Sequence, residues 1–372
     1  LRDPDRLVYY KPEVSGMVIG GYEPNTVPFG NNGIPHDFGR ELLAENFDRF
    51  EQLAQLAAEI TPFVNEVGIR EVINGPIPYS ADGDFVMGKV PEMDNYFVAS
   101  GFLYGIAAGG GAGRMMAEWI LDGQPSLDLW PLDVRRFMPH HNTKYFMYGR
   151  AIDHYGHHYK LHFPGNETQA VRGIRRSPLY YPLKQKGAVF GARAGWERPN
   201  WFAPEGVEPV DELSFERSEC NWFAPASEEH KAVRERVALI DQSSFAKMEL
   251  SGPGVLATLQ KLAVSNMDKP VGSVIYTQLC NEGGGVECDL TISRIAEDRF
   301  YVVTGSGFGV HDFNWIERHL PDDGSLTMQE VTSAYAVINI CGPRSREVLA
   351  KVCDADLSSE AFAFSTCQYI EL

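Results

Sequence analysis

The sequence predicts a multidomain protein of mixed α/β or α+β class. Its 372 residues exceed the roughly 100–200 residues of a typical single domain. Short runs typical of strands alternate along the chain with stretches in which apolar residues recur at helical spacing. Hydrophobic residues make up 44% of the chain, which is enough for buried cores. No apolar run approaches the roughly 20 residues that a membrane-spanning helix needs.

The region up to about residue 137 is predicted to combine short strands with two helices. Three runs have the composition of strands: Leu7–Tyr10, Met17–Tyr22 and Tyr96–Ser100. Apolar residues at helical spacing predict a helix over Glu41–Val64. A second helix is predicted over Met115–Leu121, and the following Asp-Gly-Gln-Pro ends it because glycine and proline interrupt helices.

A change of composition separates this part from the rest of the chain. Residues 138–176 are rich in histidine, tyrosine and glycine and are predicted to connect two modules. A new module is expected from Ser177 onward, with a helix capped near Ser227. Its clearest elements are a strand over Lys247–Ser251, a helix over Val255–Leu262, a hairpin of Val274–Cys280 with Val286–Arg294, and a closing strand-like run over Cys367–Leu372.

Charge and cysteine content exclude several classes of protein. A net charge of −17 argues against a nucleic-acid partner, which requires clustered cations. The six cysteines show no C-x-x-C spacing and lie mostly in apolar, strand-like surroundings. This pattern favours buried thiols in a reducing compartment over a disulfide framework or a zinc site.

The stretch SGFLYGIAAGGGAGRMMAEW, between Ser100 and Trp119, is predicted to be a glycine-rich loop that runs into a helix. Glycine lets backbone N–H groups approach a bound group closely, and a helix N-terminus adds partial positive charge. No placement of G-x-G-x-x-G fits the glycines, so a dinucleotide-binding fingerprint is excluded. Ligand contact and tight helix–sheet packing both remain open for this stretch.

The second strand of the predicted hairpin carries one notable carboxylate. Alternation places Val286, Cys288, Leu290 and Ile292 on one face, and Glu287, Asp289, Thr291 and Ser293 on the other. Asp289 is therefore either a solvated surface carboxylate or a group at the floor of a pocket. In the second case it acts as a base or holds a protonated nitrogen.

Histidines and tyrosines leave two further questions open. His154, His158 and His162 are four residues apart, so on a continuous helix they would share one face and could bind a metal. Gly156 weakens that helix, and packing between histidine and aromatic rings is the favoured alternative. Tyr9 and Tyr10 are either ordinary strand aromatics or phenols that face a substrate.

Longer stretches resemble one family over nearly the whole chain. Those of the first part are LRDPDRLVYYKPEVSGMVIGGYEPN, NGPIPYSADGDFVMGKVP, the glycine stretch with GRMMAEWILDG, and LWPLDVRRF. Those of the second part are RRSPLYYPLKQKGAVFGARAGWERPNWF, HKAVRERVALIDQSSFAKMELSGPG and VIYTQLCNEGGGVECDLTISRIAEDRFYVVTG. In this order they resemble the flavin-dependent dimethylglycine/sarcosine dehydrogenase family. Its members fuse an amine-oxidising flavin domain to a folate domain like that of the glycine-cleavage T-protein.

This resemblance implies a fold for each part of the chain. Residues 1–137 would form the C-terminal half of an FAD domain of the glutathione-reductase-like or D-amino-acid-oxidase-like fold. Residues 138–176 would be a connecting segment or middle domain, and 177–372 the first part of an aminomethyltransferase-like folate domain. Related enzymes also carry a G-x-G-x-x-G motif, a histidine that often attaches the flavin, and a later half of the folate domain. None of these lies in the sequence, so we expect an internal fragment that alone binds flavin weakly or not at all and has no turnover.

The resemblance also implies roles for individual residues. Six residues of the glycine stretch would bind FAD, through backbone N–H groups that stabilise the reduced flavin: Gly101, Tyr104, Gly105, Ile106, Gly109 and Gly110. Tyr9 would border the amine pocket, and Asp289 would handle protons at the folate nitrogen, so both are candidate catalytic residues. Tyr276, across the hairpin, is a further candidate for the folate pocket. No metal is implied.

The implied activity is FAD-dependent oxidative demethylation of an N-methylated glycine of the dimethylglycine or sarcosine type. The one-carbon unit would pass to tetrahydrofolate, and the electrons to oxygen or to a carrier flavoprotein, in a bacterial cytoplasm or a mitochondrial matrix. One alternative is a non-catalytic regulator, because the regulatory subunit of pyruvate dehydrogenase phosphatase resembles the same family. The presence of Tyr9, Tyr10 and Asp289 favours an enzyme. The region before Ser177 argues against a second alternative, an aminomethyltransferase without redox chemistry.

Overall fold

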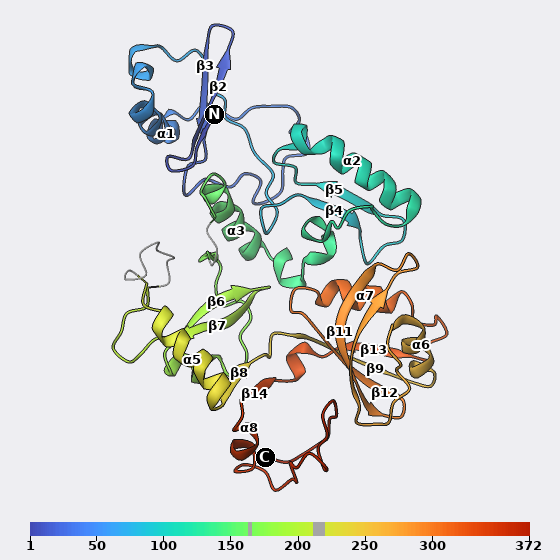
Figure 1. Cartoon of the computed structure of the whole chain (residues 1–372). Coiled ribbons are helices and arrows are strands. Elements are labelled where there is room, and N and C mark those ends of the chain that lie inside the picture. The colour runs from blue at the N-terminus through green and yellow to red at the C-terminus, as the bar shows by residue number, and fades with distance from the viewer. Residues whose placement is uncertain (163–165, 211–219) are drawn as a thin grey trace. The chain divides into compact units, whose positions relative to one another are not determined.

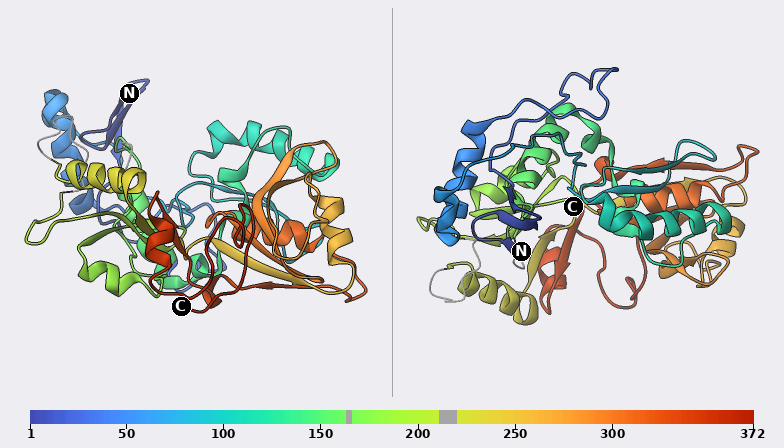
Figure 2. Two further views of the ribbon diagram at one scale, coloured as in Figure 1. Left: turned by 60° about the horizontal axis from the view of Figure 1, so that its bottom comes forward. Right: turned by 90° about the horizontal axis from the view of Figure 1, so that it is seen from above.

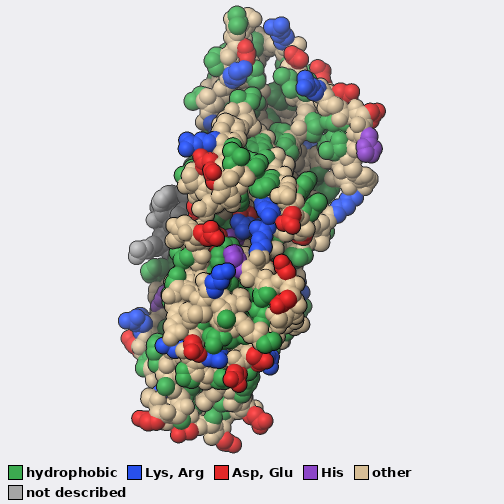
Figure 3. Space-filling model, turned by 90° about the vertical axis from the view of Figure 1, so that its right-hand side faces the viewer, with side chains coloured by type: hydrophobic (Ala, Val, Ile, Leu, Met, Phe, Trp, Pro, Cys, Tyr) green, Lys and Arg blue, Asp and Glu red, His purple; other side chains and the backbone are tan. Residues whose placement is uncertain are grey.

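A computed structural model describes residues 1–162, 166–210 and 220–372 of the chain. The chain divides into two compact units, Leu1–Val171 (unit 1) and Arg172–Leu372 (unit 2), each with its own strands and helices (Figure 1). Among the described helices, none is both long and apolar enough to cross a membrane. On the face shown in Figure 3, acidic and basic side chains are interspersed, with hydrophobic side chains exposed between them.

The N-terminal part of unit 1 is a small antiparallel sheet covered by one helix. Its strands β1 (Arg2–Asp3), β2 (Val8–Glu13) and β3 (Gly16–Gly21) lie in sequence order. Helix α1 (Phe47–Ile60) buries Leu53 and Ala57 against Val8 and Tyr10. The Tyr10 hydroxyl also donates to the Ala57 carbonyl oxygen at 3.2 Å, which fastens the helix to β2.

The two strands and the helix predicted here are confirmed, although the helix is shorter than expected. The Asn46 side chain accepts a hydrogen bond from the Arg49 amide at 3.1 Å and so caps the first turn. The residues from Glu41 to Asn46 are therefore not helical. A short 3₁₀ turn, η1 (Pro62–Glu66), follows the helix, and its proline prevents the α-helix from continuing.

A second core of unit 1 joins a hairpin to a long helix. Strands β4 (Val86–Lys89) and β5 (Phe97–Ser100) pair antiparallel. Helix α2 (Gly105–Asp122) packs on them, with Met115 and Trp119 buried against Phe85 and Met87. Gly123 ends the helix in a left-handed conformation with φ of 83°, as the sequence predicted.

The prediction of a glycine loop is wrong, because the glycines from Gly105 to Gly113 belong to helix α2. The helix begins at Gly105, not at Met115. A methyl group added at Gly109, Gly110, Gly111 or Gly113 would meet nothing within 4 Å, so tight packing against the sheet does not explain these glycines either. The glycine stretch is helical because four residues of α2 pack on the β4–β5 hairpin: Ala108, Ala112, Met115 and Trp119. This tertiary packing outweighs the low helix propensity of glycine.

The segment predicted to connect two modules contains secondary structure of its own. The 3₁₀ turns η2 (Trp130–Leu132) and η3 (Val134–Arg136) precede it, and the segment itself contains the 3₁₀ turn η4 (Pro139–Asn142) and helix α3 (Lys144–His157). The ring of His158 lies 4.6 Å from that of Tyr22, whose ring also contacts Tyr155 and Tyr159. The structure therefore shows the packing of histidine on aromatic rings, and burial lowers the pKa of His154 and His158.

Unit 2 opens with a helix, a hairpin and a second helix. These are α4 (Tyr180–Gln185), β6 (Ala188–Arg193), β7 (Trp196–Phe202) and α5 (Phe223–Glu235). The prediction that Ser227 caps a helix is wrong, because α5 begins four residues earlier. The Ser227 hydroxyl donates instead to the Phe223 carbonyl oxygen at 2.7 Å, inside the helix.

The main part of unit 2 is a five-stranded antiparallel sheet in the order β10-β11-β12-β9-β13. Its strands are β9 (Ala246–Ser251), β10 (Val274–Cys280), β11 (Val286–Ala296), β12 (Arg299–Thr304) and β13 (Thr327–Glu330). Helices α6 (Val255–Leu262) and α7 (Gly309–Glu317) cover one face, and their apolar side chains share one core with the strands (Figure 2). The predicted strand before α6, the bounds of α6 and the predicted hairpin are confirmed.

The remaining elements of unit 2 lie outside this sheet. Strands β8 (Ala238–Asp241) and β14 (Ile338–Cys341) pair with each other; η5 (Thr332–Ala334) precedes β14, and α8 (Ser345–Leu349) follows it. The closing run Cys367–Leu372 is not a strand, and the isolated bridge near it, between Thr366 and Ser273, precedes it. Its last residues, Tyr369 and Leu372, are exposed.

Substitution of a glycine in α2 tests whether this stretch is a helix with an open face. Gly110→Ala should raise the free energy of unfolding of this chain by about 0.5–1 kcal/mol, because alanine is the better helix former and the site is open. As a matched contrast, Gly88→Ala should destabilise the chain, since Gly88 has φ of 113° and an added methyl group would lie 2.7 Å from the Trp119 ring. Urea unfolding measures both changes, and equal losses in both variants would contradict an open helical face.

Candidate functional site

The hairpin of β10 and β11 brings together the polar residues of the candidate site. In the antiparallel register Gln278 lies directly opposite Asp289, and Tyr276 lies opposite Thr291. On the other face, Cys288, Leu290 and Ile292 are buried in the core, as the alternation predicted. Val286, expected on that core face, is 62% exposed, because it precedes the point where the ladder is interrupted by a bulge.

Three side chains on the exposed face interact with one another, and we call them the polar triad: Tyr276, Gln278 and Asp289. The Gln278 amide donates to Asp289 Oδ1 at 3.1 Å. The Asp289 carboxylate also interacts with the Tyr276 phenol and raises the pKa of that phenol. The carboxylate is thus oriented by the Gln278 amide and keeps lone pairs for a ligand. Gln278 was missed by the sequence analysis, and only the cross-strand register reveals it.

The same face of the sheet carries a second polar group farther along the strands. Tyr301 on β12 lies opposite Glu249 on β9. The Tyr335 hydroxyl donates to Glu249 Oε1 at 2.9 Å, and Arg299 bonds to the same carboxylate at 2.8 Å. Burial raises the pKa of Tyr301 to about 12. The face therefore offers aromatic rings beside oriented carboxylates, a combination that suits a flat heteroaromatic ligand with N–H donors.

Tyr9, the other candidate catalytic residue, lies in unit 1. It is opposite Gly20 in the β2–β3 register, and a methyl group at Gly20 would come within 2.5 Å of the Tyr9 ring. The ring therefore lies directly over the glycine, and its edge-to-face contact with Tyr159 has a centroid distance of 6.0 Å. Gly20 thus determines where the Tyr9 ring can lie.

The predicted FAD-binding residues gather at the beginning of α2. Gly101 has φ of 74°, and Tyr104 is the N-cap residue of the helix. The N–H groups of Gly105 and Ile106 lie in the first turn, where an α-helix provides no acceptor, so they are open to a ligand. Gly109 and Gly110 lie deeper in the helix, where an N–H bonds to the carbonyl four residues earlier, so they are not the N–H donors expected from a loop.

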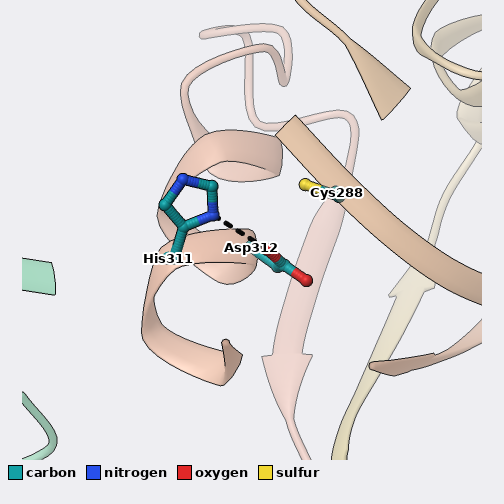
Figure 4. A group of neighbouring side chains, drawn as sticks. All are labelled: Cys288, His311 and Asp312. Atoms are coloured by element: carbon teal, nitrogen blue, oxygen red, sulfur yellow. Dashed lines mark hydrogen bonds and ion pairs between the residues drawn. The ribbon is translucent and has the colours of Figure 1, made fainter. Parts of the chain in front are cut away.

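One group of potential metal ligands stands out among the described residues. Cys288, His311 and Asp312 come together on the core side of β11 (Figure 4). His154, His158 and His162 form no such group in the described part of the chain. Among the described residues the six cysteines form no disulfide, and Cys220 and Cys288 are buried.

Models of three protein families match consecutive segments of the chain. An FAD dependent oxidoreductase model matches residues 1–119, an FAD dependent oxidoreductase central domain model matches 122–177, and a GCVT N-terminal domain model matches 179–372. These domains define the class as an FAD-dependent oxidoreductase joined to a T-protein-like domain, with FAD and tetrahydrofolate as the cofactors of such an arrangement.

Curated relatives cover nearly the whole chain. A 4-methylaminobutanoate oxidase (formaldehyde-forming) of Paenarthrobacter nicotinovorans is 34% identical over 372 residues, which is 100% of this chain and 45% of the relative. The mitochondrial dimethylglycine dehydrogenase of Mus musculus is 35% identical over 371 residues, 98% of this chain and 42% of the relative. The mitochondrial pyruvate dehydrogenase phosphatase regulatory subunit of Mus musculus is 32% identical over 373 residues, with the same coverage.

The chain belongs to the dimethylglycine/sarcosine dehydrogenase family, in which these three domains follow one another in this order. The resemblance drawn from the sequence and its two-part fold are confirmed. The chain spans less than half of the length of these relatives. The roles of Tyr9, Tyr276, Asp289 and the residues at the start of α2 remain predictions.

The polar triad can be tested by titrating Tyr276. Replacement of the acceptor in Asp289→Asn should lower the pKa of the Tyr276 phenol, because the neighbouring carboxylate favours the protonated phenol. Gln278→Leu should raise it further, since the Gln278 hydrogen bond favours the phenolate. Tyrosine-ring NMR against pH, assigned with Tyr276→Phe, measures both shifts. Tyr335, whose pKa is raised by Glu249, is the control that should not move. An unchanged Tyr276 titration in Asp289→Asn would contradict the triad.

Proposed function

We propose that a protein containing this chain oxidises the N-methyl group of a small methylated amine and transfers the carbon to tetrahydrofolate. The substrate is a dimethylglycine- or sarcosine-type amine. The observation that carries this proposal is the oriented Asp289 carboxylate on the exposed face of a T-protein-like domain that follows an FAD-dependent oxidoreductase segment. The relatives support it, since two of them are named as an oxidase and a dehydrogenase of methylated amines.

The chemistry divides between the two units. FAD bound to this unit would supply the acceptor for a hydride from the N-methyl carbon, which would leave the substrate as an iminium ion. Tyr9 lies beside the amine, with its ring held over Gly20. The open N–H groups of Gly105 and Ile106, together with the positive end of the α2 dipole, stabilise negative charge at the flavin site.

In unit 2, Asp289 serves the transfer of the carbon. Two folate nitrogens bond in turn to the iminium carbon while both of its bonds to the substrate nitrogen break, and the demethylated amine leaves. The folate nitrogens lose two protons in this exchange, of which one goes to the leaving amine and the other must be accepted by a base. Asp289 accepts that proton or stabilises the cationic nitrogen, and Gln278 and Tyr276 keep its carboxylate in place. The electrons leave to oxygen or to a carrier flavoprotein, and the reaction takes place in a bacterial cytoplasm or a mitochondrial matrix.

A second candidate function is that of a non-catalytic regulator. The 32% identity to a phosphatase regulatory subunit favours it, at a similarity close to that of the enzymes. Tyr9 and Asp289 favour the enzyme, because a regulator needs neither a phenol beside an amine nor an oriented carboxylate at a folate nitrogen. The two functions differ in one readily measured property, amine-dependent reduction of a dye.

The experiment compares a protein that contains this chain with its Asp289→Asn variant. Amine-dependent dye reduction should persist in the variant, while methylene-tetrahydrofolate formation falls about 10²–10⁴-fold, the usual loss on removal of a general acid or base. Free formaldehyde should accumulate instead. Glu282→Gln, an exposed charge change in the turn of the same hairpin, should change neither readout. Unchanged methylene-tetrahydrofolate formation would refute the role of Asp289, and absence of amine-dependent reduction in the unaltered protein would refute the enzyme.

A further inference from the structure

A buried cluster on the core side of β11 is used by neither step of the proposed reaction. It contains the thiol of Cys288 from β11 and the side chains of His311 and Asp312 from α7 (Figure 4). One ligand atom of each residue lies within 4.8 Å of the others. The exposed fractions are 1% for Cys288, 7% for His311 and 1% for Asp312, so the cluster is shielded from water.

Each of the two α7 side chains is oriented by a further polar group. The Thr304 hydroxyl donates to Asp312 Oδ2 at 2.6 Å, which leaves Oδ1 directed at His311 Nδ1, 2.8 Å away. On the opposite edge of the imidazole, Glu287 Oε2 lies 3.5 Å from Nε2. Glu287 is itself held by the Asn281 amide, which donates to its Oε1 at 2.9 Å. Carboxylates and hydroxyls placed in this way behind histidine and aspartate are typical of the outer shell of protein metal sites.

The charges of the cluster also suit a bound divalent cation. The Asp312 carboxylate is buried beside the His311 imidazole and beside a thiol that becomes an anion when it binds a metal. A divalent cation among the three ligand atoms would replace the Nδ1 proton and the thiol proton. Thiolate and carboxylate would then balance the two positive charges, and neutral imidazole would keep an N–H on Nε2 for Glu287.

We propose that Cys288, His311 and Asp312 bind a zinc-type divalent metal. Sulfur, imidazole and carboxylate form a mixed ligand set that suits Zn²⁺ or Co²⁺, whereas Mg²⁺ and Ca²⁺ prefer oxygen ligands alone. The site lies on the opposite face of β11 from Asp289, so its role is to fasten α7 to the strand that carries the polar triad. It is independent of the proposed reaction and can exist in a protein with either of the two candidate functions.

Spacing rules overlook this site because its ligands come from two distant elements. The search for C-x-x-C sees only ligands that are neighbours in sequence. Cys288 and His311 are separated by the rest of β11, by β12 and by the turn into α7. The antiparallel return of the chain and the packing of α7 on the sheet bring them together.

The test is a titration of the full chain with Co²⁺ after removal of metals with EDTA, under anaerobic conditions. One equivalent of Co²⁺ should produce a thiolate-to-cobalt charge-transfer band in the near ultraviolet, together with visible d–d bands. Zn²⁺ should displace it, and an excess of Mg²⁺ should not. Cys288→Ser should abolish the charge-transfer band, and Cys341→Ser, a change of a thiol on β14, should leave it intact.

A milder variant keeps the test decisive if substitutions in the core prevent folding. Glu287→Gln preserves the size of a residue outside the metal-binding atoms and should lower the Co²⁺ affinity about 10–100-fold. Two results would overturn the proposal: no charge-transfer band in the unaltered chain, or the same band in Cys288→Ser. Either result would leave the cluster as a hydrogen-bonded network without metal.

Discussion

The two-residue period of β11 is the constraint on which the rest of unit 2 depends. One face of this strand buries Cys288, Leu290 and Ile292 under α6 and α7, so its register cannot slip without exposing the core. The opposite face then holds Asp289 in register with Gln278. Packing on one side thereby determines the position of the candidate chemistry on the other, where the Gln278 amide donates to the Asp289 carboxylate.

In unit 1, glycines rather than strand register create the accessible space at the candidate site. Gly20 lets the Tyr9 ring lie over β3, and the space beside Gly109, Gly110, Gly111 and Gly113 of α2 is open. The helix still forms, because its other side is packed on the β4–β5 hairpin. Its first N–H groups are therefore supported by a rigid element, which is a better platform for a developing negative charge than a mobile loop.

The sequence predicted the elements that depend on local interactions and missed the contacts that depend on distant ones. The bounds of α6 and the β10–β11 hairpin were predicted well, because alternation and helical spacing are set by near neighbours. The glycine stretch failed, since a run of glycines has low helix propensity and only distant packing makes it helical. Gln278 and the cluster of Cys288 with His311 were missed for a related reason. Strand register and helix docking join residues that no spacing rule connects.

We expect the exposed face of β10 and β11 to bind a folate. Backbone amide NMR of the chain during titration with tetrahydrofolate tests it most directly, because shift mapping also detects weak binding. Saturable shifts should centre on Tyr276, Gln278 and Asp289 and their strand neighbours, and they should be much smaller in Asp289→Asn. Shifts centred elsewhere in the chain, or shifts of equal size in Asp289→Asn, would contradict it.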